Sequence, residues 1–157
     1  MSYNALRKGR FSETGREYFL TSVIHHRNPV FDNFHCARIL IDTLRQSESK
    51  HVCRWLCWVI MPDHFHGLLQ LNDADQHDLA KIMQFIKGNS AKEINQYLQR
   101  TGKVWQTSFH DRALRKEDDR LAIARYIVAN PLRSGIVRRL SEWPHWDSVW
   151  LGDGLSD

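Results

Sequence analysis

The sequence is poor in the residues that mark disulfide-stapled, fibrous or membrane-spanning chains. Its 157 residues include only three Cys, four Pro and eight Gly. An odd number of Cys excludes a fully paired disulfide framework, and the low Pro and Gly counts argue against a disordered or collagen-like chain. No apolar run reaches the ~18 residues that cross a bilayer. Residues 1–19 also lack the apolar core of a secretory signal. We therefore expect one folded domain over residues 1–157, located in the cytosol and not bound to a membrane.

Positive charge is concentrated in two segments, although the formal net charge is only +4. Residues 1–16 carry four cations against one acid, and residues 111–139 carry eight against four. Seven of the eight cations in the second segment are Arg, whose guanidinium binds phosphate through two N–H groups. This distribution permits a nucleic-acid partner, and a solvated helix face with mixed charges would also account for it.

The hydrophobic spacing predicts an α+β fold. Apolar and β-branched patterns predict strands at 17–24, 52–61, 64–71 and 109–116. Spacings of three and four residues predict helices at 34–44, 77–100 and 120–129. Gly88 allows a break in the second helix, Asp118 or Asp119 would cap the third, and Asn130-Pro131 would end it. The order favours a ferredoxin-like sandwich, with one antiparallel sheet and the helices on one face. The Trp-rich tail, 141–157, is expected to form packed turns.

The first candidate for chemistry is the segment His64-Phe65-His66, at the start of a predicted strand and directly after a turn. Residues two apart on a strand point the same way, so both imidazoles would project from one face and Phe65 from the other. Their spacing suits two ligands of one metal ion. Two surface histidines on an exposed strand face would have the same pattern.

The second candidate is the pair Tyr126 and Asn130, four residues apart on a predicted helix and therefore on one face of it. A tyrosine hydroxyl close to a bound cation can act as a nucleophile toward phosphorus. The oxygen of the Asn130 carboxamide is a suitable third metal ligand. A core tyrosine followed by a helix-ending Asn would also explain the pair.

Five sequence blocks, in this order, resemble a known family. They are Trp58–Leu69 (WVIMPDHFHGLL), Lys87-Gly88, Val104–Gln106, Phe109–Arg112 and Arg125–Val137. Together they resemble the single-tyrosine HUH transposases, and within these the REP-associated tyrosine transposases. The resemblance spans about Gly15 to Val149 and depends on the ordered combination of His-Phe-His with Tyr-x-x-x-Asn-Pro.

The resemblance implies a metal-dependent single-strand DNA endonuclease and strand transferase on a ferredoxin-like sheet that carries the HUH motif. His64 and His66 match the two histidine ligands, and Asn130 matches the carboxamide that completes the metal site. Tyr126 matches the nucleophile, which forms a 5′-phosphotyrosine link and leaves a free 3′-OH. Members use Mg²⁺ or Mn²⁺ and act on hairpin DNA, so the protein would act at the bacterial nucleoid. A monomer is favoured, and a dimer is the alternative.

Many cations are candidate DNA contacts, since several flank the proposed site and others lie in the basic N-terminal segment. They are Arg7, Lys8, Arg10, Lys87, Lys92, Arg112, Arg115, Lys116, Arg133, Arg138 and Arg139. Each would also be accounted for as a solvated surface charge.

Two alternative functions remain open from the sequence. One is a non-catalytic hairpin-DNA-binding protein of the same fold, domesticated from a transposase. The other is a small zinc protein or hydrolase, which would need a third acidic or Cys ligand near the histidines. Cys53 and Cys57 lack the C-x-x-C spacing, and we expect them to be buried free thiols on the same face of a strand.

Overall fold

A five-stranded antiparallel sheet with the order β4-β1-β3-β2-β5 forms the centre of the computed structural model, which describes residues 16–51, 53–72, 78–115 and 117–150. The strands are β1 (Glu17–Val23), β2 (Cys53–Met61), β3 (His64–Leu71), β4 (His110–Ala113) and β5 (Trp146–Ser148). The α-helices are α2 (Phe34–Lys50), α3 (Leu79–Leu98), α4 (Arg120–Val128) and α5 (Asn130–Arg133), and short 3₁₀ turns are η1 (His25–Arg27), η2 (Val30–Asp32) and η3 (Leu140–Glu142). The predicted α+β class with an antiparallel sheet is confirmed.

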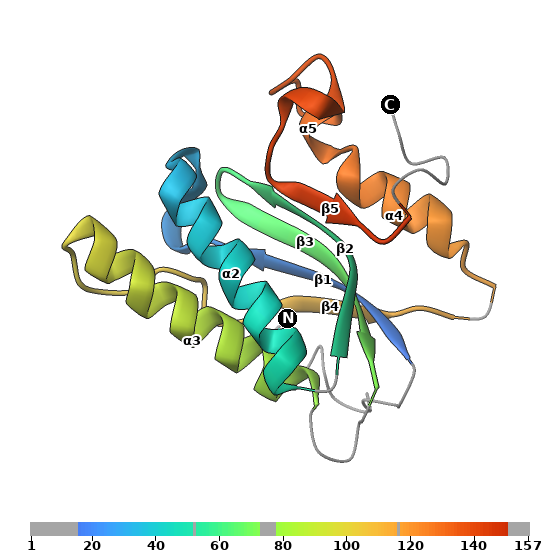
Figure 1. Cartoon of the computed structure of the whole chain (residues 1–157), viewed down its shortest axis with the longest axis horizontal. Helices are drawn as coiled ribbons and strands as arrows, with labels where there is room; N and C mark the ends of the chain where they lie inside the picture. Colours follow the sequence, from blue (N-terminus) through green and yellow to red (C-terminus); the bar gives the residue numbers. More distant parts are fainter. Residues whose placement is uncertain (1–15, 52, 73–77, 116, 151–157) are drawn as a thin grey trace.

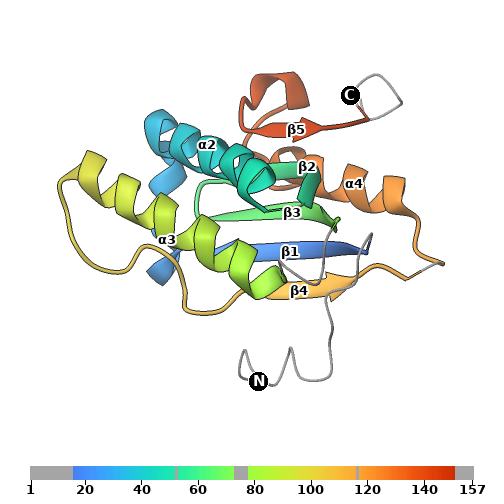
Figure 2. The same cartoon turned by 60° about the horizontal axis from the view of Figure 1, so that its bottom comes forward.

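Helices cover both faces of the sheet (Figures 1 and 2). The helices α2 and α3 pack over one face on a core that includes Leu20 and Phe65. The helices α4 and α5 pack over the other face, where Val59 and Leu68 are buried. The expectation that all helices lie on one face is wrong. The strand β2 has hydrophobic side chains on both of its faces, so helices must cover both sides of the sheet to bury them.

Several elements differ in extent from the sequence-based expectations. The helix α2 continues to Lys50, since Ser47 is buried within it and its hydroxyl hydrogen-bonds the carbonyl of Leu44. The helix α3 runs through Gly88 without a break. In the C-terminal segment, β5 pairs with β2 where only turns were expected. The N-cap of α4 is Asp119, whose side chain accepts a hydrogen bond from the amide of Ala122, as the capping prediction required.

The cysteines are buried free thiols, as expected, but they do not share one face. A β-bulge between Trp55 and Cys57 shifts the register of β2, so Cys53 packs in the α2/α3 core and Cys57 in the α4 core. Burial raises the pKa of each of these two thiols to about 12. Both are therefore inert packing residues near neutral pH.

Gly67 allows the Trp55 ring to pack directly on the backbone of β3. A Cβ at position 67 would lie 2.5 Å and 2.8 Å from two ring carbons of Trp55. We expect Gly67→Ala to lower the free energy of unfolding by about 1–3 kcal/mol, because the buried indole cannot move aside without overpacking the core. Gly88→Ala is the matched control, since a Cβ there meets no atom within 4 Å and should raise stability by up to about 1 kcal/mol. Urea denaturation of both variants measures this, and equal stability of the two would contradict it.

Candidate active site

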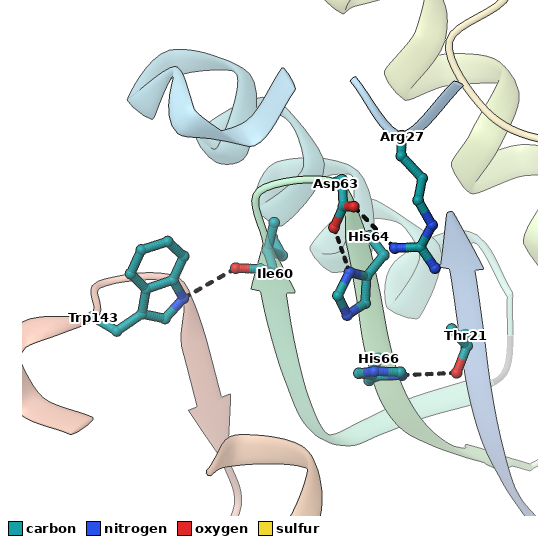
Figure 3. Close-up of polar contacts among 7 residues, drawn as sticks. All are labelled: Thr21, Arg27, Ile60, Asp63, His64, His66 and Trp143. Carbon is teal, nitrogen blue, oxygen red and sulfur yellow. Dashed lines mark hydrogen bonds and ion pairs between the residues drawn. The ribbon is translucent and has the colours of Figure 1, made fainter. Parts of the chain in front are cut away.

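His64 and His66 begin β3 and point toward the same side of the sheet, as the alternation of strand side chains predicts (Figure 3). Their ring centres are 4.8 Å apart, with the rings inclined at 76°. Phe65, between them, is fully buried in the core on the other face. The pair therefore lies on the α4 face of the sheet, next to the tight turn at Pro62 and Asp63.

Each imidazole is held through its Nδ1 atom. The carboxylate of Asp63 lies 2.7 Å from Nδ1 of His64, and the hydroxyl of Thr21 lies 2.7 Å from Nδ1 of His66. The guanidinium of Arg27 donates to the other oxygen of Asp63 at 3.0 Å, so the carboxylate is itself fixed. Figure 3 shows these partners around the two rings. With Nδ1 engaged, Nε2 is the nitrogen that each ring has available for a metal ion.

The protonation states suit metal binding. Burial, together with the charges of His64 and Arg133, lowers the pKa of His66 to about 4, so this imidazole is neutral near pH 7. Burial opposes ionisation of Asp63, but hydrogen bonds from His64 and Arg27 outweigh it and lower the pKa of that carboxyl. The site thus combines a neutral imidazole at His66 with an ionised carboxylate that orients His64.

Tyr126 lies on α4 over the same face of the sheet and is 54% exposed. The ring of Phe19 connects it to the histidines, because its centre lies 6.3 Å from the Tyr126 ring and 5.6 Å from the His66 ring. The strand β1 carries both Phe19 and Thr21. Phe19 contacts His66 and Tyr126, and Thr21 hydrogen-bonds His66. Tyr126 and the two histidines therefore lie over the same face of the sheet, with the Phe19 ring between Tyr126 and His66.

Arg133 of α5 folds back onto Tyr126. Its guanidinium carbon lies 3.9 Å from the centre of the tyrosine ring, and its Nη1 donates to the Tyr126 carbonyl at 2.7 Å. The same cation is close enough to His66 to lower the pKa of that imidazole. Arg133 thus places a positive charge beside both the tyrosine and the histidine pair, where a phosphate would be attracted.

Asn130 begins α5, four residues after Tyr126 and partly buried. The helix α4 ends at Val128, but Ala129 keeps helical backbone angles, so Asn130 follows in nearly helical continuation. The role of its carboxamide as a metal ligand stays a prediction. Among the described residues, no group of three His, Cys, Asp or Glu is placed to hold a metal.

The remaining candidate DNA contacts are distributed over several surfaces. Arg112 lies on β4 opposite Phe19, hence on the site face, and forms an ion pair with Asp118 at 3.2 Å. The cations Arg115, Arg138 and Arg139 are exposed in the segments on either side of α4 and α5, and Lys87 and Lys92 are on α3 across the sheet. Arg7, Lys8, Arg10 and Lys116 lie outside the described residues.

Sequence reasoning did not single out Thr21, Arg27 or Phe19, and it quoted Asp63 without giving it a role. Three of these four come from β1 and the turn after it, and they meet β3 only through strand pairing. His110 completes one row across the sheet, since it is opposite Thr21, which in turn is opposite His66. The pairing register, which no local pattern encodes, is the signal that would have found them.

Comparisons with known proteins bear on the family and the fold of this chain. Residues 14–130 match the family described as Transposase IS200 like. A Haemophilus influenzae protein named for the REP-associated tyrosine transposases is 25% identical over 147 residues, covering 83% of this chain and 78% of that protein. The REP-associated tyrosine transposase of Escherichia coli K12 is 30% identical over 89 residues, which cover 55% of this chain and 49% of the relative.

Two solved structures share the fold. The structure of a REP-associated tyrosine transposase bound to a REP hairpin matches with a TM-score of 0.72 at 23% identity, over 87% of this chain and 79% of that one. A crystal structure of a Deinococcus radiodurans R1 protein described as a transposase matches with a TM-score of 0.54 at 26% identity, over 76% and 94%. These matches confirm the expected fold class, and the family match confirms the resemblance seen in the motifs.

Asp63 should control how well the histidine pair binds a divalent ion. We expect Asp63→Ala to weaken Mn²⁺ binding by roughly 10–100-fold, because the His64 ring loses the carboxylate that fixes its tautomer and orientation. Titration with Mn²⁺, followed by electron paramagnetic resonance with and without single-stranded DNA, measures the affinity. Asp42→Ala removes a carboxylate of an exposed ion pair with Arg45 and is the matched control. Equal Mn²⁺ affinities for the two variants would contradict the assignment.

Proposed function

Because the chain belongs to the IS200-like transposase family, we propose that it is a metal-dependent single-strand DNA endonuclease and strand transferase that acts on hairpin DNA through Tyr126. The observation that carries this proposal is the arrangement around Phe19, whose ring contacts both Tyr126 and His66. An exposed tyrosine, two imidazoles and an arginine thus surround one patch of the α4 face. The solved relative of the same fold that is bound to a REP hairpin supports hairpin DNA as the substrate class.

The reaction follows from the nucleophile. The Tyr126 hydroxyl oxygen attacks the phosphorus of a phosphodiester, and the bond from phosphorus to the 3′ oxygen breaks. The downstream strand is then linked through its 5′ phosphate to the tyrosine, and the tyrosine proton ends on the leaving oxygen as a free 3′-OH. Attack by another 3′-OH on the phosphotyrosine reverses the step and joins strands. The bond energy is kept in the covalent link, which agrees with the lack of a G-x-x-x-x-G-K-[ST] phosphate loop in the sequence.

The residues present fit a divalent cation at His64 and His66. The Nδ1 atoms of both rings are already occupied by Asp63 and Thr21, which leaves the two Nε2 atoms as ligands, and Asn130 is the proposed third. These three neutral ligands add no charge, so we expect tight binding only when phosphate oxygens complete the coordination. Bound Mg²⁺ or Mn²⁺ would polarise the phosphoryl group toward attack.

Arg133 has two tasks in this proposal. Its stacking on the ring and its hydrogen bond to the Tyr126 carbonyl hold the end of α4 in place. Its guanidinium can also neutralise the charge that develops on the phosphoryl oxygens as Tyr126 attacks.

Replacement of the nucleophile tests the proposal directly. We expect wild-type protein, incubated with a labelled DNA hairpin carrying a single-stranded extension and Mg²⁺ or Mn²⁺, to form a denaturant-resistant adduct. Tyr126→Phe should abolish the adduct and leave hairpin binding unchanged, because only the reacting oxygen is lost. Tyr97→Phe is the matched control, since Tyr97 is exposed on α3 and far from the proposed chemistry. Binding without any adduct in the wild type would instead support the non-catalytic hairpin-binding alternative.

Arg133→Ala should slow adduct formation about a hundredfold, because a positive charge beside the developing oxyanion is removed. Arg133→Lys should recover part of the rate, since it keeps the charge but not the planar stack on Tyr126. Single-turnover rates at saturating DNA separate this effect from weaker binding. Arg138→Ala provides a control with the same loss of charge in an exposed neighbouring segment. A rate for Arg133→Ala equal to that of the wild type would show that Arg133 has no part in the reaction.

A further inference from the structure

The chain turns sharply after β1 through two residues in the left-handed backbone region. His26 has a φ of 57° and Arg27 a φ of 52°. In this region the Cβ atom of an L-residue crowds the following carbonyl oxygen, so the conformation costs free energy and is seldom adopted by two successive residues. Among the described residues, the other non-glycine with a positive φ is Gln99, which ends α3, where a left-handed residue is common. His26 and Arg27 do not lie at the end of an α-helix.

Burial of its own side chains does not explain the strained turn. None of the three residues of η1 is buried, and both His26 and Arg27 are exposed. The rings of His25 and His26 stack with their centres 3.8 Å apart at the surface. Backbone bonds enforce the conformation, because the amide of His25 donates to the carbonyl of Val104 and the amide of Arg27 donates to the carbonyl of Ile24, each at 2.8 Å. Strain that the surroundings enforce in this way is concentrated at functional sites.

The turn brings the Arg27 guanidinium to the residue that precedes β3, as Figure 3 shows. Its Nη1 donates to one oxygen of Asp63 at 3.0 Å, and the other oxygen of Asp63 lies 2.7 Å from Nδ1 of His64. The backbones of the two segments are also joined, since the amide of Ile24 donates to the carbonyl of Asp63 at 2.8 Å. Two successive contacts therefore connect Arg27 through the carboxylate to the imidazole.

The ion pair alone stabilises the fold too little to account for the strain. The Arg27 side chain is 64% exposed and that of Asp63 is 24% exposed. Water screens such a pair, so it contributes less to stability than two left-handed residues cost. The turn thus lowers the stability of the fold while it fixes a carboxylate beside His64. A loss of stability of this kind is common where a residue positions a functional group.

We propose that Arg27 is a positioning residue, which the strained turn holds in place so that Asp63 keeps the His64 imidazole in one tautomer and one orientation. The neutral ring then carries its proton on Nδ1, where it donates to Asp63, and leaves Nε2 free to bind. The proposal deepens the proposed function and rests on it only in taking His64 as a metal ligand. Arg27 acts through Asp63 and needs no contact with DNA for this role.

Glycine at position 27 separates the contact from the strain. Arg27→Gly removes the guanidinium and also the strain, because glycine adopts a positive φ without a steric cost. Arg27→Ala removes the guanidinium and keeps the strain. The matched controls are Gln99→Gly and Gln99→Ala, which change a left-handed residue on the helix that covers the other face of the sheet. The measurements are thermal unfolding, ¹⁵N–¹H correlation spectra of the imidazoles in metal-free protein, and Mn²⁺ binding by electron paramagnetic resonance.

We expect Arg27→Gly to unfold about 2–4 °C above Arg27→Ala, and Gln99→Gly to unfold above Gln99→Ala by a similar amount. Both Arg27 variants should nevertheless bind Mn²⁺ about tenfold more weakly than the wild type and show His64 as a mixture of tautomers. The wild type and both Gln99 variants should show the tautomer protonated on Nδ1. Arg27→Lys, which keeps the charge, should recover part of the affinity. A wild-type tautomer and wild-type Mn²⁺ affinity in Arg27→Gly would overturn the proposal.

The spectra of metal-free protein separate this proposal from the proposed function, because they require neither metal nor DNA. A single His64 tautomer in the wild type that becomes mixed in Arg27→Gly would support the role of Arg27 even if no adduct forms at Tyr126. An adduct in the wild type, together with an unchanged His64 tautomer in Arg27→Gly, would support the enzyme and reject the role of Arg27.

Discussion

The pairing of β3 with β1 and β2 in one register is the constraint on which the rest of the structure depends. Side chains alternate across a strand, so this register buries Phe65 under α2 and α3 and points His64 and His66 to the opposite face. It also sets Thr21 opposite His66, where its hydroxyl holds the imidazole. A slip by one residue would bury both imidazoles in an apolar core and expose Phe65. The chemistry of the site and the stability of the sheet therefore require the same alignment.

The two faces of the sheet have different roles. The α2/α3 face contains the larger core, and the α4 face contains the candidate site beside a smaller one. The helix α4 is fixed in the smaller core by Ala124, Ile127 and Val128, and its 3.6-residue period turns Tyr126 away from that core toward solvent. A tyrosine on a helix anchored in this way is exposed to solvent and still held in position. Arg133, from the next helical turn, restrains it further.

Elements with strong local patterns could be predicted from the sequence, and those that depend on distant partners could not. The strand 64–71 and the helix from residue 120 agree with the structure, because alternation and an N-cap at Asp119 are local signals. The pairing of β5 with β2 was missed, since three residues stabilise a strand only through the partner they find. The bulge that separates Cys53 from Cys57 likewise exists only in the paired sheet. For the candidate site, the motifs singled out the two histidines and the tyrosine, and no local pattern singled out Arg27 or Phe19.

The sequence alone therefore identified the family and the side chains that are candidates for metal binding and catalysis. The order of His-x-His and Tyr-x-x-x-Asn-Pro pointed to a transposase, and the match over residues 14–130 agrees. Only the tertiary structure decided which side chains orient those groups. Thr21 and His66 are 45 residues apart, and Arg27 and Asp63 are 36 apart. Such contacts form when a whole sheet closes in one register, and that choice depends on packing summed over both cores, which no short segment of sequence contains.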